Sequence, residues 1–300
     1  MTVKKVRVAL AQWRIGEPAA IDPFFGRLAV AMSEAARQGA RIIVLPEYLS
    51  LELAATFDAD TRGDFVRSLE ALQGLRETWI DMIGSTARAR GLYIVAGSFP
   101  VRQENGRYRN RSYLVSPSGG EPLYQDKLTL TGFERASGVI EPGDALKTFD
   151  TEFGHLGIAV CYDAEFPLYA RAQARAGARL LLVPSCTDTE AGATRVRVGC
   201  MARALENQIY VGQAVTAGEA PWSPALDANT GTAALYAPSD RGMPSDGVVA
   251  RAERDSTWVI AEVDYERLDE VRREGQVAND ADWDEQLRPS LLTAMVEHPP

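Results

Sequence analysis

Cys161 is the residue of this 300-residue chain whose position most suggests covalent chemistry. The apolar run from Leu156 to Val160 has the length of a buried strand, and Cys161 follows it directly, ahead of a polar turn that contains Pro167. In open α/β sheets the loops that follow the strands form the crevice in which ligands bind. Cys161 is therefore a candidate nucleophile. The alternative is a structural cysteine, since free cysteine is among the most buried residue types.

A thiol nucleophile normally needs a base, because a free cysteine with a pKa of about 8.5 is only slightly ionised at neutral pH. Histidine is the usual base, but the two histidines of this chain are poorly placed. His155 precedes Cys161 by roughly 20 Å along an extended strand, and His298 lies close to the end of the sequence. We interpret both histidines as structural, so carboxylates or a lysine must set the reactivity of Cys161.

Three charged residues are candidates for that role. Glu47 follows Pro46 at the end of an apolar run, where an unpaired charge is costly. Lys127 lies in a strand-like segment, 123–128, and Glu134 lies in the polar segment after it. Each has a structural alternative: solvation at a strand end for Glu47, extension of the side chain to water for Lys127, and an exposed loop position for Glu134.

The first third of the chain alternates strand and helix patterns. Apolar spacing predicts strands at 6–11, 42–45 and 93–98, and helices at 25–38, 64–75 and 78–90. The run at 42–45 is apolar throughout, as in a parallel strand that is buried on both faces. Turn signals at Asn105-Gly106 and at 116–120 then predict an antiparallel middle region.

A partial repeat indicates two similar α/β halves. The segment Gly39-Ala-Arg-Ile-Ile-Val-Leu-Pro46 is echoed by Gly177-Ala-Arg-Leu-Leu-Leu-Val-Pro184. Each copy ends a helix at glycine, forms an apolar strand and stops at proline. Glu47 and Ser185 then occupy equivalent strand-end positions, so we expect both copies to face the crevice that holds Cys161.

The remaining patterns predict a helix at 196–207, strands at 210–215, 232–236, 247–252 and 258–263, and a helix at 266–274. Residues 279–300 lack periodicity and are expected to form a C-terminal arm that contacts a partner subunit. No linker or low-complexity segment divides residues 1–278, which we interpret as one domain.

The composition excludes several classes of partner. A formal net charge of −9 argues against nucleic acid and against anionic membrane surfaces, because phosphates attract basic faces. The three cysteines lack CxxC spacing, which argues against a disulfide framework or a zinc site and favours a reducing, cytoplasmic setting. No signal region and no apolar span of transmembrane length is found, so we expect a soluble, unprocessed chain.

Taken in order, these motifs resemble the nitrilase superfamily of carbon–nitrogen hydrolases. The resemblance covers about residues 5–270, and the motifs that establish it are Pro46-Glu47, Lys127-Leu128, Glu141-Pro-Gly-Asp144, Cys161-Tyr-Asp163, Phe166-Pro167, Val183-Pro-Ser185, 202–211 and 246–250. It implies a four-layer αββα sandwich with mixed sheets, homodimers or higher homo-oligomers, and no metal or organic cofactor.

The resemblance also implies roles for individual residues. Glu47 is expected to act as general acid and base. Lys127 and the backbone N–H of Tyr162 are expected to hold an oxyanion. Cys161 is expected to form a thioester, while Glu134 braces Lys127 and the substrate.

The residues around Cys161 indicate the branch within the superfamily. Cys161-Tyr-Asp followed by Phe166-Pro167 is similar to amidase-type members, including ω-amidase-like proteins, so we expect hydrolysis of a small linear amide. N-carbamoyl compounds and nitriles remain alternative substrates. A non-catalytic binding protein and a redox-active thiol protein are the alternatives of another class.

Substrate-binding residues are predicted with several alternatives left open. Ser185 is assigned to the substrate-binding group by its strand-end position. Arg195, with Arg197, is a candidate to pair a substrate carboxylate, although both also suit a solvated helix face. Trp222, in a long loop, is expected either to line the pocket or to contact a partner subunit.

Overall fold

Strand β1 (Lys5–Arg14) is central to the sheet structure of the computed structural model, which describes residues 4–299. It pairs with β14 (Trp258–Asp264) in antiparallel fashion and with β2 (Ile42–Leu45) in parallel. The first half of the sheet continues through β3 (Tyr93–Ala96), β5 (Tyr108–Val115), β4 (Phe99–Arg102) and β6 (Leu123–Asp126). Strands β4, β5 and β6 pair antiparallel, which confirms the two predicted hairpins.

The second half has the parallel series β10 (Tyr210–Glu219), β9 (Leu180–Ser185) and β8 (Gly154–Ile158), followed by antiparallel β7 (Thr148–Thr151). Three short strands extend it, namely β11 (Ala228–Asn229), β12 (Ala234–Tyr236) and β13 (Val248–Arg251). The far end of β1 joins the two halves, because residues 12–14 pair with 215–217 of β10. Elsewhere the halves stack face to face, and a Cβ added at Gly212 would lie 2.8 Å from Leu10.

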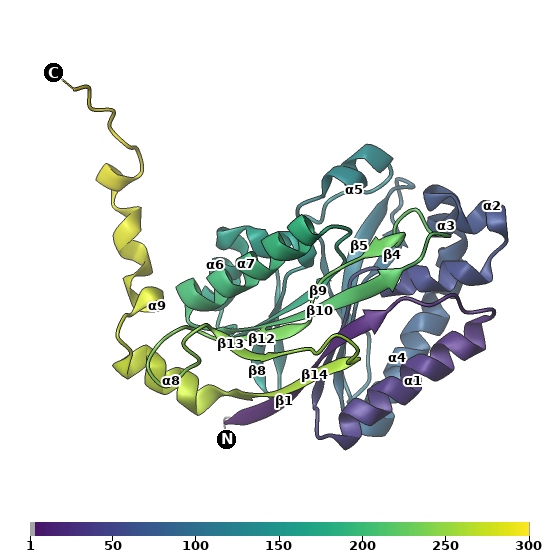
Figure 1. The fold of residues 1–300 in the computed structure, drawn as a ribbon, viewed down its shortest axis with the longest axis horizontal. Coiled ribbons are helices and arrows are strands. Elements are labelled where there is room, and N and C mark those ends of the chain that lie inside the picture. Colours follow the sequence, from purple (N-terminus) through teal and green to yellow (C-terminus); the bar gives the residue numbers. More distant parts are fainter. Residues whose placement is uncertain (1–3, 300) are drawn as a thin grey trace.

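Helices cover the two outer faces, which completes the predicted αββα order (Figure 1). Helices α1 (Ile21–Arg37) and α4 (Arg76–Arg90) lie on the first half, and α6 (Pro167–Arg175) and α7 (Glu190–Asn207) lie on the second. The buried residues of α1 recur at helical spacing, so one stripe faces the sheet. The shorter helices are α2 (Ala59–Arg62), α3 (Phe65–Leu72), α5 (Gly132–Ser137), α8 (Tyr265–Glu274) and α9 (Asn279–Asp282).

The two copies of the sequence repeat form β2 and β9, as predicted. Gly39 and Gly177, which precede them, have φ angles of 87° and 95°, a left-handed conformation that favours glycine at the end of a helix. Every residue of both strands is buried. Glu47 and Cys186 therefore lie just after the ends of two equivalent buried strands, β2 and β9.

Several helices and strands are longer than predicted, for identifiable reasons. Helix α7 begins at Glu190 rather than at 196, because the Thr189 side chain caps it by accepting from the N–H of Gly192. Strands β1 and β10 extend beyond the predicted ends at 11 and 215, because these extensions pair with each other. Long-range pairing of this kind leaves no local signal in a sequence.

The C-terminal segment leaves the body of the molecule after α8 (Figure 1). Its start is anchored by Asp280, which lies 2.6 Å from Arg171, and by Trp283, whose ring lies 4.7 Å below the same guanidinium. Residues 288–299 are exposed throughout. The contact of this arm with a partner subunit stays a prediction. No helix among residues 4–299 is long and apolar enough to cross a membrane.

Candidate active site

A cavity of about 280 Å³ brings the four predicted catalytic residues together. Glu47 follows β2, Lys127 follows β6, Glu134 lies in α5 and Cys161 follows β8, so segments far apart in the sequence supply them. All four side chains are at most 3% exposed. Burial of charged groups costs free energy unless they pair with one another. The pairing of these four side chains therefore determines which of them are charged.

Cys161 lies at the turn between β8 and a short 3₁₀ segment, Cys161–Glu165. Its φ of 50° is uncommon for a residue other than glycine, and such strain often occurs at functional positions. The thiol donates to the carbonyl of Cys186, with Sγ 3.6 Å from the oxygen. Burial, together with the negative charge of Glu47, raises the pKa of Cys161 well above its usual value. At neutral pH the sulfur is therefore a thiol, which needs a base.

Glu47 has the surroundings of such a base. Its Oε1 accepts from Lys127 Nζ at 2.8 Å and from Asn110 Nδ2 at 2.8 Å, while its Oε2 accepts from the N–H of Cys186 at 3.0 Å. Burial raises the pKa of Glu47, and the charge of Lys127 and a hydrogen bond with Cys161 oppose that rise. A carboxylate with a raised pKa exchanges protons more readily near neutral pH than an exposed glutamate does.

Lys127 and Glu134 form a second ion pair in contact with the first. Lys127 Nζ lies 2.9 Å from Glu134 Oε2, and Glu134 Oε1 also accepts from the hydroxyl of Tyr48 at 2.7 Å. Burial opposes the charge on Lys127, but Glu134 and Glu47 raise its pKa well above the usual value. Burial would raise the pKa of Glu134, yet Lys127 lowers it. Glu134 is thus held ionised while Glu47 is left to exchange a proton.

The sequence folds locally to fix Glu134. Thr131 and Glu134 form a capping box at the start of α5: the backbone N–H of Glu134 donates to Thr131 Oγ1, and Glu134 Oε2 accepts from the N–H of Thr131 at 2.8 Å. The carboxylate that binds Lys127 is therefore also the cap of its own helix.

The backbone around Lys127 is held from three directions. Its N–H donates to the carbonyl of Asn110, and its carbonyl accepts from the N–H of Gly143 at 2.7 Å. Asp163 accepts from the N–H groups of Leu128 and Thr129 at 3.0 and 2.8 Å. Asp163 lies in the 3₁₀ segment that Cys161 starts, so it joins the nucleophile turn to the lysine loop.

Comparison with known proteins identifies the family of this chain. The sequence profile of the carbon–nitrogen hydrolase family matches residues 7–273. This chain belongs to that family. It is 30% identical over 274 residues to the probable hydrolase YhcX of Bacillus subtilis (strain 168), a match that covers 91% of this chain and 52% of that protein. The chain thus spans about half the length of that relative.

This carbon–nitrogen hydrolase is also similar to a second relative in sequence and to a solved structure in fold. It is 27% identical over 279 residues to omega-amidase NIT2 of Danio rerio, covering 91% of this chain and 93% of that protein. The crystal structure of Nit3 from Saccharomyces cerevisiae, a member of branch 10 of the nitrilase superfamily, has a TM-score of 0.72 at 23% identity. That match covers 91% of this chain and 94% of Nit3. The predicted fold and membership of the carbon–nitrogen hydrolases are confirmed.

Of the predicted oxyanion and substrate-binding residues of this hydrolase, some line the cavity and others do not. Tyr162 lines the cavity, and its N–H is in the first turn of a 3₁₀ segment, where N–H groups have no partner within the turn. Ser185 is fully buried, does not line the cavity, and donates to the carbonyl of Val183. The next residue, Cys186, is the one at the wall. Strand alternation explains the difference, because neighbouring side chains point to opposite faces.

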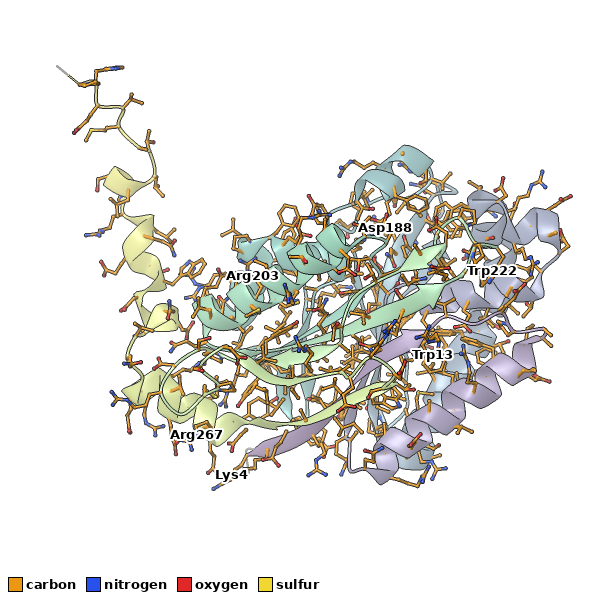
Figure 2. The ribbon with its side chains drawn as sticks, viewed as in Figure 1. Lys4, Trp13, Asp188, Arg203, Trp222 and Arg267 are labelled. Atoms are coloured by element: carbon orange, nitrogen blue, oxygen red, sulfur yellow. The ribbon has the colours of Figure 1, made fainter. Side chains whose placement is uncertain are left out.

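The two arginines considered for a substrate carboxylate are separated. Arg195 lines the catalytic cavity, whereas Arg197 lines a smaller cavity of about 180 Å³ beside β12. Residues two apart on a helix do not share a face. Trp222 does not line the catalytic cavity, and Figure 2 shows it away from Asp188, which does. His155 and His298 are both exposed and outside the cavity.

Sequence reasoning missed Asn110, Tyr48 and Asp163 as supporting residues. Asn110 had a readable signal, because in β5 the buried residues Tyr108, Asn110 and Ser112 alternate with the partly exposed arginines between them. An inward-facing asparagine next to a charged site must find polar partners. Tyr48 follows the Pro46-Glu47 motif and Asp163 ends the Cys161-Tyr-Asp163 motif, but the sequence gave no sign of their partners. Residues 4–299 contain no cluster of three or more histidine, cysteine or acidic side chains suited to a metal ion.

Proposed function

We propose that this hydrolase cleaves the C–N bond of a small linear amide through a thioester at Cys161. The observation that supports the proposal most strongly is that one cavity holds a buried thiol, Cys161, and a buried carboxylate, Glu47, that is hydrogen-bonded to the ammonium group of Lys127. This combination provides a nucleophile, a base for it, and a positive charge for the oxygen of the substrate. The name of the Danio rerio relative, an omega-amidase, supports the amide as substrate class.

In the first step Cys161 Sγ attacks the amide carbon while Glu47 takes the thiol proton. The C–S bond forms and the carbonyl π pair moves to oxygen. Lys127 has three N–H donors and two carboxylate partners, Glu47 and Glu134, and we assign one of its donors to this oxyanion. The N–H of Tyr162 provides a second donor.

In the second step Glu47 returns its proton to the amide nitrogen as the C–N bond breaks, and ammonia or an amine leaves. The acyl group stays on Cys161 as a thioester. Water then attacks the thioester carbon while Glu47 takes a water proton. The C–S bond breaks, the carboxylic acid is released, and the proton returns to the sulfur. Glu47 thus gains and loses a proton twice per turnover, which requires a pKa nearer to neutrality than that of an exposed glutamate.

The test is ammonia release from short aliphatic amides, dicarboxylate monoamides, N-carbamoyl amino acids and nitriles. The expected result is turnover of amides, with a carboxylic acid as product, that falls by about a thousandfold or more in Cys161→Ala. Cys200→Ala is the matched control, because Cys200 is equally buried but lies outside the cavity. Product analysis separates amides from N-carbamoyl compounds and nitriles. No turnover, together with a Cys161 that resists alkylation, would instead indicate a non-catalytic binding protein.

A further inference from the structure

The charges that line the catalytic cavity are strongly unbalanced. Its lining contains two cations, Lys127 and Arg195, against five carboxylates: Glu47, Glu134, Glu165, Asp188 and Asp227. Lys127 is bound to Glu47 and Glu134. The balance at the entrance therefore depends on Arg195 and the three outer acids.

Arg195 is already paired. Its Nε lies 3.7 Å from Glu165 Oε1, and its side chain is 61% exposed. Burial raises the pKa of Glu165, and Arg195 opposes that rise. Because Glu165 accompanies Arg195, a substrate carboxylate approaching this arginine would meet a negative charge as well.

The other two outer acids have no cationic partner. Asp188 and Asp227 form no ion pair with any lysine or arginine among residues 4–299. Asp188 lies in the loop between β9 and α7, and Asp227 immediately precedes β11, so two separate loops bring them to one cavity. Burial and the charge of Glu47 raise the pKa of Cys186 to about 12, and Asp188 adds to that rise. The field of Asp188 therefore extends to the inner wall.

The amino end of α7 does not offset this charge. An exposed helix start attracts anions, and Gly192 in the first turn of α7 lines the cavity. However, the Gly192 N–H already donates to Thr189 Oγ1 at 3.1 Å. Glu190, the first residue of α7, adds a negative charge to this turn, and Asp188, labelled in Figure 2, precedes it in the sequence. The outer cavity thus favours a positive group over a carboxylate.

We infer that the preferred substrate is a short linear amide whose far end is a protonated amine, bound between Asp188 and Asp227. The inference rests on the proposed function of the same cavity and specifies its substrate class. A volume of 280 Å³ equals that of about nine water molecules, which limits the substrate to a short chain. The inference also disfavours the monoamide of a dicarboxylate as substrate, because the same acids repel its free carboxylate.

The test compares kcat/KM for three amides of matched length: 5-aminopentanamide, hexanamide and glutaramate, which end in ammonium, methyl and carboxylate. We expect the ammonium substrate to exceed the methyl one by about tenfold, and the carboxylate substrate to be the poorest. The double variant Asp188→Asn/Asp227→Asn should reduce the ammonium preference to about the methyl level. It should change hexanamide turnover less than 5-aminopentanamide turnover, because the methyl end has no charge for the two acids to bind. Added salt should weaken the preference, since the acids are exposed.

Arg195→Gln distinguishes the rival interpretation. If Arg195 binds a substrate carboxylate, glutaramate is the best of the three substrates and loses its advantage in this variant, which would overturn the inference but not the proposed amidase activity. Should no amide be turned over, the proposed function fails on its own, and calorimetry on Cys161→Ala then decides the inference. Tighter binding of 5-aminopentanamide than of glutaramate supports it, and equal or reversed affinities contradict it.

Discussion

Asn110 Nδ2 donates to Glu47 Oε1 at 2.8 Å and, at 3.2 Å, to Glu134 Oε1. One amide group therefore bridges the two carboxylates that bind Lys127. The Oδ1 of Asn110 is buried and has no partner among the described residues, so only the donor end of this side chain is used. An amide donor between two carboxylates lowers their mutual repulsion without adding a charge that would compete with Lys127.

Asn110 is thus predicted to be a positioning residue that sets the pKa of Glu47. Asn110→Ala should lower kcat by about 10- to 100-fold, because hydrogen bonds to charged groups contribute about 1.5–3 kcal/mol. The acid limb of the pH–kcat profile should also move to higher pH, since a lost donor makes ionised Glu47 less stable. Ser112→Ala is the control, as Ser112 is the next inward-facing buried residue of the same strand. A uniform loss of kcat with an unmoved pH profile would contradict the role.

The fold was largely predictable because its strongest signals are local. The apolar run at β2, the glycines before β2 and β9, and the hairpin turns of β4 to β6 each depend on a few neighbouring residues. The joining of the sheet halves through β1 and β10 was not predictable, because it pairs residues about two hundred positions apart. The start of α7 was readable in principle from Thr189.

The site was predictable where the motif residues touch one another. Glu47, Lys127, Glu134 and Cys161 came from the family resemblance, and the structure gathers them in one cavity. The substrate-binding residues were not fixed in the same way, because strand alternation at β9 decides between Ser185 and Cys186 at the wall. A single residue of register changes that outcome.

The second prediction concerns pH. Cys161 is a thiol of strongly raised pKa, so alkylation by iodoacetamide through the free thiolate would speed up about tenfold per pH unit between pH 7 and 9. If Glu47 instead takes the thiol proton during the attack, the rate should stay nearly constant over this range, where Glu47 is ionised. Turnover needs ionised Glu47, whose pKa burial raises above 4.5, so activity should fall as the pH drops through that raised value. Glu47→Gln should abolish the acid limb together with most activity. An alkylation rate that rises about tenfold per pH unit would show that the reactivity of Cys161 does not depend on Glu47.

The third prediction concerns stability. Lys127→Met leaves two buried carboxylates without their cation, which should lower the free energy of unfolding by about 3–5 kcal/mol at pH 8. Without the lysine both carboxylates have raised pKa values in the folded state, so the variant should be most stable at low pH and lose stability as the pH rises. The deficit relative to the wild type should therefore be smaller at pH 5 than at pH 8, as measured by urea unfolding. Lys147→Met, which removes a lysine outside the cavity, serves as the control.

The fourth prediction concerns Asp163, which joins the nucleophile turn to the lysine loop. Burial raises its pKa to about 7, against 3.8 in the unfolded chain, although the N–H groups of Leu128 and Thr129 oppose the rise. A raised folded-state pKa means that its contribution to stability is complete below about pH 4 and is lost as the pH rises through 7. Asp163→Asn should remove that dependence between pH 4 and 7.

The same variant tests whether Asp163 positions Lys127. The side-chain amide that Asp163→Asn introduces can accept from only one of the two N–H groups in the same geometry, because its other end is a donor. Loosening of the loop should lower kcat by about tenfold or more while KM changes little, since Lys127 is proposed to act on the oxyanion rather than on the bound amide. Asp150→Asn, at an exposed position of strand β7, is the control for loss of an aspartate outside the site. A rise in KM at constant kcat would assign Asp163 to substrate binding instead.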